Sequence, residues 1–144
     1  MPRMFFLNLP VTDLKRATAF YEAVGGTRNP QFSDDTASCM VFSEAIYVML
    51  TTHDKFRHFT PKPIADAKTS NQALFCLSAD SRKEVDEIVD KAAAAGGKID
   101  IREKQDLGFM YSRSFEDLDG HIFEPLHMNM DAFLAAGDAA HEHA

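Results

Sequence analysis

The sequence predicts an α+β domain in which one strand–helix–strands unit occurs twice. Two apolar runs each lead into a helix that ends at a Gly-Gly pair, and each half of the chain closes with a short β-rich run. The apolar runs are 6–11 and 74–78, the glycine pairs are 25–26 and 96–97, and the β-rich runs are 46–50 and 122–126. A unit that is used twice favours a pseudo-twofold domain with a pocket between its halves.

The composition fits one domain and argues against nucleic-acid or membrane binding. The chain has 144 residues, of which 45% are hydrophobic, so it can bury a core as a single domain. Its net charge of −7 provides no basic patch for a phosphate backbone. No apolar run approaches the roughly 18 residues of a membrane span, and we expect no signal peptide. Cys39 and Cys76 form neither a metal motif nor a disulfide framework, so we expect a cytoplasmic protein.

Capping residues and helical spacing predict both helices. Residues 4–11 form a buried strand, and Asp13 is the predicted N-cap of the first helix. Ser81 and Glu84 form a predicted capping box at the second helix. The glycine pairs supply left-handed C-caps. The predicted apolar stripes are Leu14, Ala17, Phe20, Tyr21 and Val24 in the first helix, and Val85, Ile88, Val89, Ala92 and Ala93 in the second.

The remaining strands and turns follow from β-rich runs and from turn residues. The strands are expected near residues 28–33, 37–43, 45–52, 98–103, 110–116 and 121–128. Pro125 cannot donate to a ladder, so we expect it at a sheet edge, a bulge or a strand end. Asp117 to Gly120 forms a predicted tight turn, in which Gly120 takes positive φ.

The chain is expected to be a single domain over residues 1–130 with a C-terminal tail. Its parts are a first module at 4–52, a connector at 53–72, a second module at 73–128 and a tail at 131–144. The connector is polar and interrupted by prolines, which indicates either a loop that covers a pocket or a mobile linker. In the Ala-rich tail, His141 and His143 are expected to be solvated.

The two halves resemble the paired βαβββ modules of the vicinal oxygen chelate superfamily, which includes glyoxalase I, bleomycin-resistance proteins and extradiol dioxygenases. The resemblance covers residues 4–128, and the runs that carry it are 9–14, 19–21, 25–26, 115–121 and 123–124. It implies two tandem modules that form a cupped mixed sheet with helices on the outside, and a homodimer. This fold hosts lyases, oxygenases, epimerases, thiol transferases and plain binding proteins, so it does not fix the function.

The resemblance also implies where a divalent metal would bind. Three of the four implied positions hold residues that are poor ligands or none, namely Phe6, Met49 and Leu74. Glu124 alone matches, and one carboxylate does not hold a metal. We therefore expect no metal cofactor; a divalent metal at a rebuilt site is the alternative.

Glu124 is the predicted centre of the pocket. Its neighbours on the strand face are apolar, so the carboxylate must either pair with a cation or take up a proton, with its pKa raised by desolvation. Arg113 is the expected partner, with Tyr111 and Asn8 as hydrogen-bond donors. The pair either anchors the strand only, or Glu124 acts as a general base or a ligand anchor. The predicted ligand-binding residues are Phe6, Asn8, Tyr47, Met49, Leu74, Cys76, Tyr111, Arg113, Ile122 and Glu124.

Three classes of function remain open. The first is a metal-independent protein that binds a small, partly apolar molecule in a central cup, comparable to the drug-sequestering members of the superfamily. The second is a lyase or a dioxygenase-type enzyme that uses Glu124 as a base or as one ligand of a rebuilt metal site. The third is a structural dimerisation module. The absent ligands argue against standard lactoylglutathione lyase chemistry, and the retained Glu124 argues against the third class. A homodimer is expected because exposed sheet edges need covering.

Overall fold

The computed structural model describes residues 3–132, 134–135 and 137, so the predictions for His141 and His143 lie outside the described residues. Both halves of the chain start with a strand and a helix and continue with further strands. The first module contains β1 (Phe5–Val11), α1 (Leu14–Ala23), β2 (Thr27–Asn29), a 3-10 turn (Pro30–Phe32), β3 (Ala37–Val41) and β4 (Ile46–Thr52). After α2 (His53–Phe56), the second module contains β5 (Leu74–Ser78), α3 (Arg82–Ala94), β6 (Lys98–Ile99), β7 (Gln105–Asp106), β8 (Met110–Ser112), β9 (Phe115–Glu116) and β10 (Ile122–Met128).

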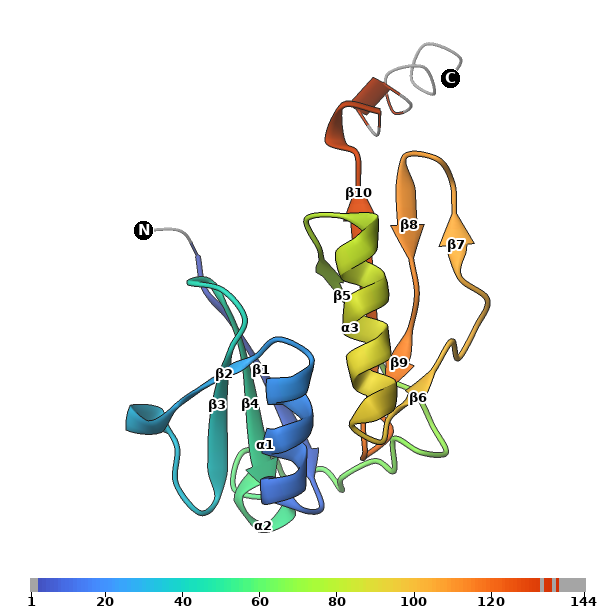
Figure 1. Ribbon diagram of the computed structural model, residues 1–144. Helices are drawn as coiled ribbons and strands as arrows, with labels where there is room; N and C mark the ends of the chain where they lie inside the picture. Colours follow the sequence, from blue (N-terminus) through green and yellow to red (C-terminus); the bar gives the residue numbers. More distant parts are fainter. Residues whose placement is uncertain (1–2, 133, 136, 138–144) are drawn as a thin grey trace.

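Each module forms its own mixed sheet, with a helix on one face (Figure 1). The first sheet has the order β1-β4-β3-β2, and β1 runs parallel to β4. In the second sheet, β10 pairs with the parallel strand β5 on one side and with the antiparallel strands β8 and β9 on the other. The predicted α+β class with curled mixed sheets is confirmed. Among the described residues, no helix has the length and apolar content of a membrane span.

The predicted helix caps form as the sequence indicates. The Asp13 side chain accepts a hydrogen bond from the Arg16 N–H, and Gly25 and Gly96 take positive φ after the two helices. Ser81 accepts from the Glu84 N–H, but the Glu84 carboxylate accepts from the N–H of Asp80, one residue earlier than a standard capping box. The apolar stripes face the core, with one correction: Ala93 is exposed, because the buried stripe follows Val85, Val89 and Ala92.

One core joins the two modules. Phe20 and Tyr21 of α1 pack against Phe115 and Phe123 of the second sheet, with ring centroids 5.9 Å apart for Phe20–Phe115 and 5.7 Å apart for Tyr21–Phe123. The Tyr21 hydroxyl also donates a buried hydrogen bond of 2.5 Å to Asp117 in the turn before β10. Burial raises the pKa values of both Tyr21 and Asp117. The helix sides of both sheets therefore meet in the same interior.

Several predicted strands are wrong in extent. The expected strand at 28–33 ends at Asn29, where Pro30 starts a 3-10 turn. The expected strand at 98–103 ends at Ile99, because Asp100 takes a φ of 50°. The expected strand at 110–116 is split into β8 and β9, and β7 was not predicted. These segments are short and lack a clear alternation of apolar and polar residues.

Pro125 is not at an edge, a bulge or a strand end as predicted. It lies inside β10, between β5 and the β8–β9 strands, and the register has no extra residue on either side of it. The register that pairs Leu126 with Ser112 and Phe123 with Phe115 places Pro125 opposite Arg113. The Arg113 N–H donates to the Pro125 carbonyl at 3.3 Å, but Pro125 has no N–H to return. The hydrogen bond that Pro125 cannot make would fall between the end of β8 and the start of β9. The strand opposite Pro125 is therefore divided in two at this point.

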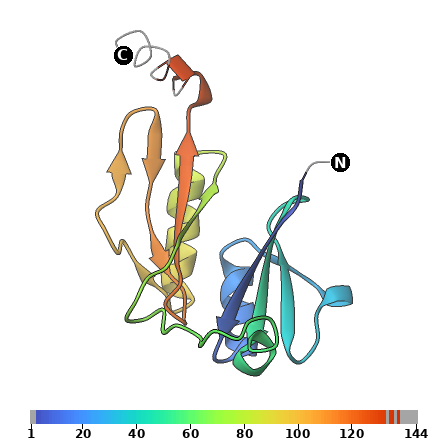
Figure 2. The ribbon, with the colours of Figure 1, turned by 180° about the vertical axis from the view of Figure 1, so that it is seen from behind.

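The connector lies against the second module and lines cavities. It begins with α2 and then runs through turns to β5, along the bottom of the molecule in Figure 2, on the side opposite α1 and α3. A Cβ placed on Gly120 would lie 2.5 Å from backbone atoms of Ala67 and Lys68, so the connector backbone packs directly on the turn before β10. Of the two predicted roles, the structure supports a loop that covers a pocket.

Candidate functional site

The predicted ligand-binding residues lie on two separate strand faces rather than around one pocket. Four belong to the face of the first sheet opposite α1, which we call face A: Phe6, Asn8, Tyr47 and Met49. Four belong to the corresponding face of the second sheet, which we call face B: Leu74, Cys76, Ile122 and Glu124. Strand alternation places each group on one side of its sheet. The other two predicted residues, Tyr111 and Arg113, lie on the α3 side of the second sheet.

Face A is an open, mostly apolar surface. Phe6 lies beside Tyr47 in the parallel β1–β4 register, and their rings stack with centroids 4.7 Å apart. Asn8 lies beside Met49, and its side-chain amide donates to the Phe6 carbonyl at 3.4 Å. The Phe6 side chain is 51% exposed. Face A therefore supplies aromatic and thioether surface but no charged group.

Face B contains an ion pair that the sequence did not reveal. Glu124 is only 7% exposed, and Arg102 from the β6–β7 loop engages both of its carboxylate oxygens. Arg102 Nε lies 2.9 Å from Oε1, and Nη2 donates to Oε2 at 2.9 Å. The thiol of Cys76, beside Glu124 in the β5–β10 register, points at Oε2 from 3.6 Å. The buried acid of the predicted pocket is thus paired, with Arg102 as its cation.

The predicted partners of Glu124 are wrong. Arg113 is used elsewhere: its guanidinium donates to Asp86 on α3 at 3.0 Å and to Asp100 at 3.0 and 2.8 Å. Tyr111 also donates to Asp86, at 2.7 Å. The register explains both errors, because residue 113 lies opposite Pro125, not Glu124, and its side chain points to the helix side. The side chain of Asn8 bonds to its own strand.

Arg113 holds the loop that carries Arg102. Asp100 has a left-handed backbone conformation, with φ of 50°, which costs free energy in a residue other than glycine. Its carboxylate is held by Arg113, and its N–H donates to the Ser114 carbonyl at 2.8 Å. The next N–H, of Ile101, donates to Ser114 Oγ at 2.9 Å. These bonds fix the backbone just before Arg102 and direct its side chain across β10.

Arg113 forms a cluster with Asp86, Asp100 and Tyr111, and this cluster is expected to make the free energy of unfolding depend on pH in the acidic range. Hydrogen bonds from Tyr111 and Arg113 lower the pKa of Asp86, and the bond from Arg113 lowers that of Asp100, both from an ordinary 3.8. Depressed carboxyl pKa values stabilise the fold above the unfolded value, and this contribution is lost as pH falls through the folded values. Urea unfolding of Arg113→Gln and wild type should therefore differ most at pH 5–7 and converge below roughly pH 3.

The comparison in that experiment isolates the cluster. The raised pKa of Asp117 has the opposite effect on stability, but both proteins contain it, so it cancels in the difference. A difference between the two proteins that stays constant from pH 7 to roughly pH 2 would contradict the assignment of Arg113 to Asp86 and Asp100.

The implied metal positions do not suit a metal ion. Phe6 and Leu74 offer no donor atom, and Met49 offers a thioether, which is a poor ligand for hard divalent ions. The Glu124 oxygens already accept from Arg102. In the described part of the chain, no group of three or more His, Cys, Asp or Glu side chains is arranged to hold a metal.

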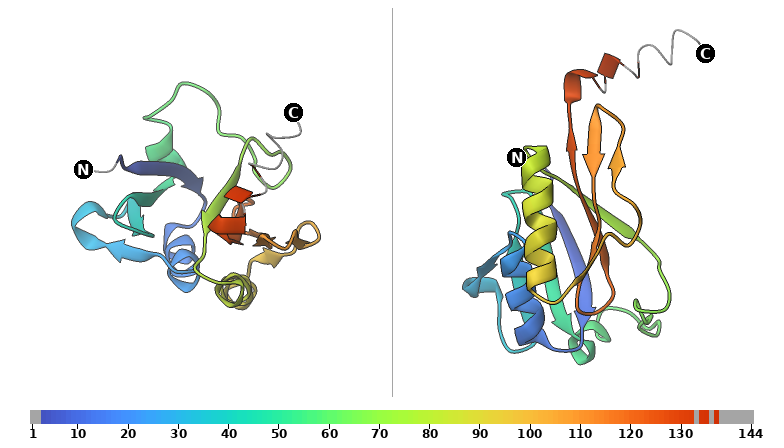
Figure 3. Two further views of the ribbon diagram at one scale, coloured as in Figure 1. Left: turned by 90° about the horizontal axis from the view of Figure 1, so that it is seen from above. Right: turned by 45° about the vertical axis from the view of Figure 1, so that its right-hand side comes forward.

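The two faces point away from each other in one chain. The helix-side residues of both sheets share one core, so the opposite sides, faces A and B, lie on the outside of the molecule. In Figure 3 (left) both helices lie on one side of the molecule, and the two sheets extend to the left and to the right of them. Leu74 on face B is 51% exposed, as Phe6 is on face A. One chain therefore presents two open half-cups. The sequence leaves open whether the central cup forms within one chain or across a dimer.

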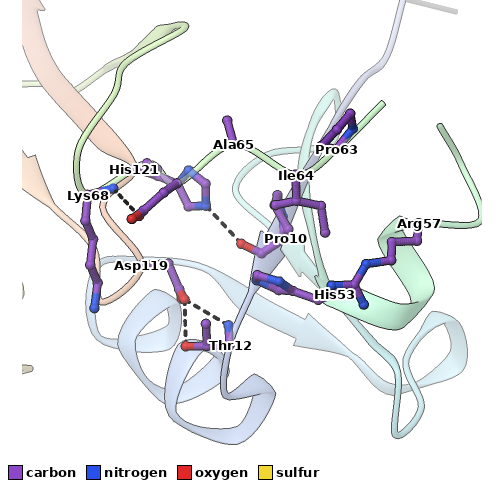
Figure 4. Close-up of a pocket in the computed structure, with 12 residues that line it drawn as sticks. Pro10, Thr12, His53, Arg57, Pro63, Ile64, Ala65, Lys68, Asp119 and His121 are labelled. Carbon is purple, nitrogen blue, oxygen red and sulfur yellow. Dashed lines mark hydrogen bonds between the residues drawn. The ribbon is translucent and has the colours of Figure 1, made fainter. Parts of the chain in front are cut away.

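A cavity of about 570 Å³ lies where the end of β1, the connector and the turn before β10 meet (Figure 4). Its polar groups join the modules. Asp119 accepts hydrogen bonds of 2.8 Å from the N–H and the hydroxyl of Thr12. His121 Nε2 lies 3.0 Å from the Pro10 carbonyl and must carry the proton, because a carbonyl only accepts. The basic residues at the rim are His53, Arg57 and Lys68. This cavity lies at the contact between the two modules, and none of the residues that define faces A and B lines it.

A second, more apolar cavity of about 340 Å³ lies beside the first, between β1, α2 and the connector. Its lining includes Leu7, Phe56, Ile64 and Phe75. Of the predicted ligand-binding residues, only Asn8 lines this cavity, and none lines the first cavity. Most of the predicted residues lie on faces A and B instead.

Known proteins share this fold and this sequence pattern. A family model described as the Glyoxalase/Bleomycin resistance protein/Dioxygenase superfamily matches residues 3–124. The solved structure of the hypothetical protein SA1046 from S. aureus is 29% identical, with a TM-score of 0.72, and the match covers 88% of this chain and 95% of that one. No curated protein gives a match.

Two more distant structures show the fold alone. A glyoxalase/bleomycin resistance protein/dioxygenase family enzyme from Burkholderia phytofirmans PsJN is 16% identical, with a TM-score of 0.71 and coverage of 88% of this chain and 99% of that one. The fosfomycin resistance protein FosX from Listeria monocytogenes is 18% identical, with a TM-score of 0.63 and coverage of 88% and 93%.

Proposed function

We propose that this chain, which belongs to the glyoxalase/bleomycin resistance protein/dioxygenase superfamily, binds a small, partly apolar molecule in a cup that uses no divalent metal. The observation that carries the proposal is the Arg102–Glu124 pair on face B. Arg102 engages both oxygens of Glu124, so a divalent ion bound to Glu124 would lie beside the guanidinium and be repelled by its positive charge. The guanidinium of Arg102 supplies the positive charge beside Glu124 that a metal ion would otherwise supply.

We propose that two copies of the chain complete the cup as a homodimer. Faces A and B both expose large apolar side chains, such as Phe6 and Leu74, which a soluble monomer would leave in water. A twofold axis that sets face A of one copy against face B of the other repeats the same contact twice and closes the assembly. Each resulting cup contains one Arg102–Glu124 pair surrounded by apolar and aromatic surface.

The alternative is an enzyme of the lyase or dioxygenase type that uses Glu124. A general base must be within reach of the proton that it takes from the substrate, but Glu124 is only 7% exposed and Arg102 engages both of its oxygens. For a substrate to reach the carboxylate, Arg102 would have to move aside. The likeness to FosX, a fosfomycin resistance protein, is too distant in sequence to transfer its activity. The binding function needs no such rearrangement.

The metal-free proposal predicts a clear analytical result. Elemental analysis of purified, dialysed protein should give much less than one divalent metal per chain, because the four implied positions offer one engaged carboxylate. Added nickel or zinc should give no turnover of the methylglyoxal–glutathione hemithioacetal. One tightly held metal per chain, or clear turnover, would favour the enzyme alternative.

A further inference from the structure

We infer that the cup selects uncharged molecules that present an oxygen acceptor to Arg102, such as amides, ketones or esters with an apolar body. The inference rests on the proposed binding function and specifies the ligand class. It follows from three features of face B: the donors that Arg102 has left, the charge balance around them, and the fixed position of the guanidinium.

Arg102 keeps hydrogen-bond donors for a ligand. Nε and Nη2 are directed at Glu124, and Nη2 also donates to Gln105 at 3.2 Å. Nη1 makes no hydrogen bond or ion pair with any residue that the structure describes. A guanidinium carries two N–H groups on this nitrogen. The Arg102 side chain is 49% exposed, so a molecule on face B can contact it.

The charges around Arg102 cancel. Glu124 neutralises the guanidinium, and the other face B residues, Leu74, Cys76 and Ile122, carry no charge when the thiol is protonated. Burial, and then the charge of Glu124, raise the pKa of the Cys76 thiol, so it stays protonated at neutral pH. A carboxylate ligand at Nη1 would be attracted by Arg102, but Glu124 on the other edge of the guanidinium would offset part of that attraction, and the ligand would give up its hydration. A neutral oxygen accepts the same hydrogen bond without these costs.

The guanidinium is positioned before any ligand arrives. Glu124 holds two of its nitrogens, and the hydrogen bonds from Arg113 to the Asp100 carboxylate and from the Ile101 N–H to Ser114 fix the preceding backbone. A donor that is already oriented loses little rotational freedom when it binds a ligand. The apolar body of the ligand would lie on Leu74 and Ile122, and on the aromatic face A of a second copy.

The test uses the full-length protein and a panel of matched primary amides and carboxylates with phenyl, cyclohexyl and alkyl bodies. Binding is followed by NMR through the backbone amides of residues 74–78, 122–124 and 126–128 and the Nε–H signal of Arg102. We expect amides to shift these signals and to bind at least about tenfold more tightly than their matched carboxylates, the loss that follows from desolvating a charge whose attraction to Arg102 is partly offset by Glu124.

Two variants test whether amide binding depends on the Arg102–Glu124 pair. The double substitution Arg102→Met, Glu124→Met removes both charges and leaves no buried ion unpaired, which preserves the fold. We expect it to weaken amide binding by about tenfold or more, the usual value of a hydrogen bond to a charged group. The control is Arg82→Met, whose guanidinium pairs with Asp106 and lies over the Tyr111 ring on the α3 side of the sheet; it should leave amide binding unchanged.

The outcomes separate the ligand class from the function itself. Equal binding of amides and carboxylates on face B, or unchanged amide binding by the double variant, would overturn the inference and leave the binding function standing. If no compound of the panel shifts any signal of face A or face B, the proposed function fails and the inference fails with it. The comparison of amides with carboxylates uses wild type alone, so it holds even if a variant does not fold.

Discussion

Replacing Phe123 with alanine is expected to destabilise the protein by about 3–5 kcal/mol, the usual cost of removing a buried aromatic ring. Phe123 is 3% exposed, stacks on Phe115 with a centroid distance of 5.4 Å, and meets the Tyr21 ring edge at 5.7 Å. It therefore packs within the second sheet and across the contact between modules. The lost ring would leave a cavity in the one core that both modules share.

Urea unfolding measures this loss, and Phe32→Ala is the matched control. Phe32 lies in the 3-10 turn and is 64% exposed, so its truncation should change the free energy of unfolding by less than about 0.5 kcal/mol. Two separate unfolding transitions in wild type, or a similar small loss for both variants, would contradict a core that joins the modules.

Gly120→Ala is expected to cost about 2–5 kcal/mol, because two effects add. Gly120 has a φ of 99°, which costs roughly 1–2 kcal/mol in a residue with a Cβ. The new Cβ would also lie 2.5 Å from the backbone of Ala67 and Lys68, and such overpacking adds about 1–3 kcal/mol. The connector must move away from the turn, so we expect faster proteolytic cleavage within residues 57–72.

Gly108→Ala separates strain from collision. Gly108 has a φ of 82°, but a Cβ there meets no atom within 4 Å. Only the backbone strain remains, so this variant should lose roughly 1–2 kcal/mol and keep the wild-type cleavage pattern. Equal losses in the two variants would mean that the connector does not pack on the turn.

Periodicity and capping were sufficient to predict the modules. Asp13, Ser81 and the two helix-ending glycines have local roles, so they could be identified without knowledge of the tertiary structure. The short strands of the second module could not be predicted in the same way. β6, β7 and β9 contain two residues each, and two residues are too few to show an alternation.

Only the part of the site that follows from strand alternation could be predicted from the sequence. Eight of the ten predicted residues lie on the expected strand faces, because alternate residues of one strand share a side. Arg113 was misplaced because its orientation depends on the register between two strands, which the sequence does not show. Arg102 was missed because it lies in an irregular loop. Its position depends on Asp100 and Arg113, which are brought together only by the fold.

The most direct test of the proposed cup is an intermolecular spin-label experiment. The double variant Asn8→Cys, Cys76→Ser, in which Cys39 is buried, would carry a nitroxide on face A. This protein is mixed with an excess of 15N-labelled wild type, so that broadening reports only on the other copy. In the proposed dimer, the backbone amides of β5 and β10, with the exception of Pro125, should broaden most. Broadening confined to β1 and β4, or none at all together with a light-scattering mass of 16.1 kDa, would contradict a cup built from face A of one copy and face B of the other.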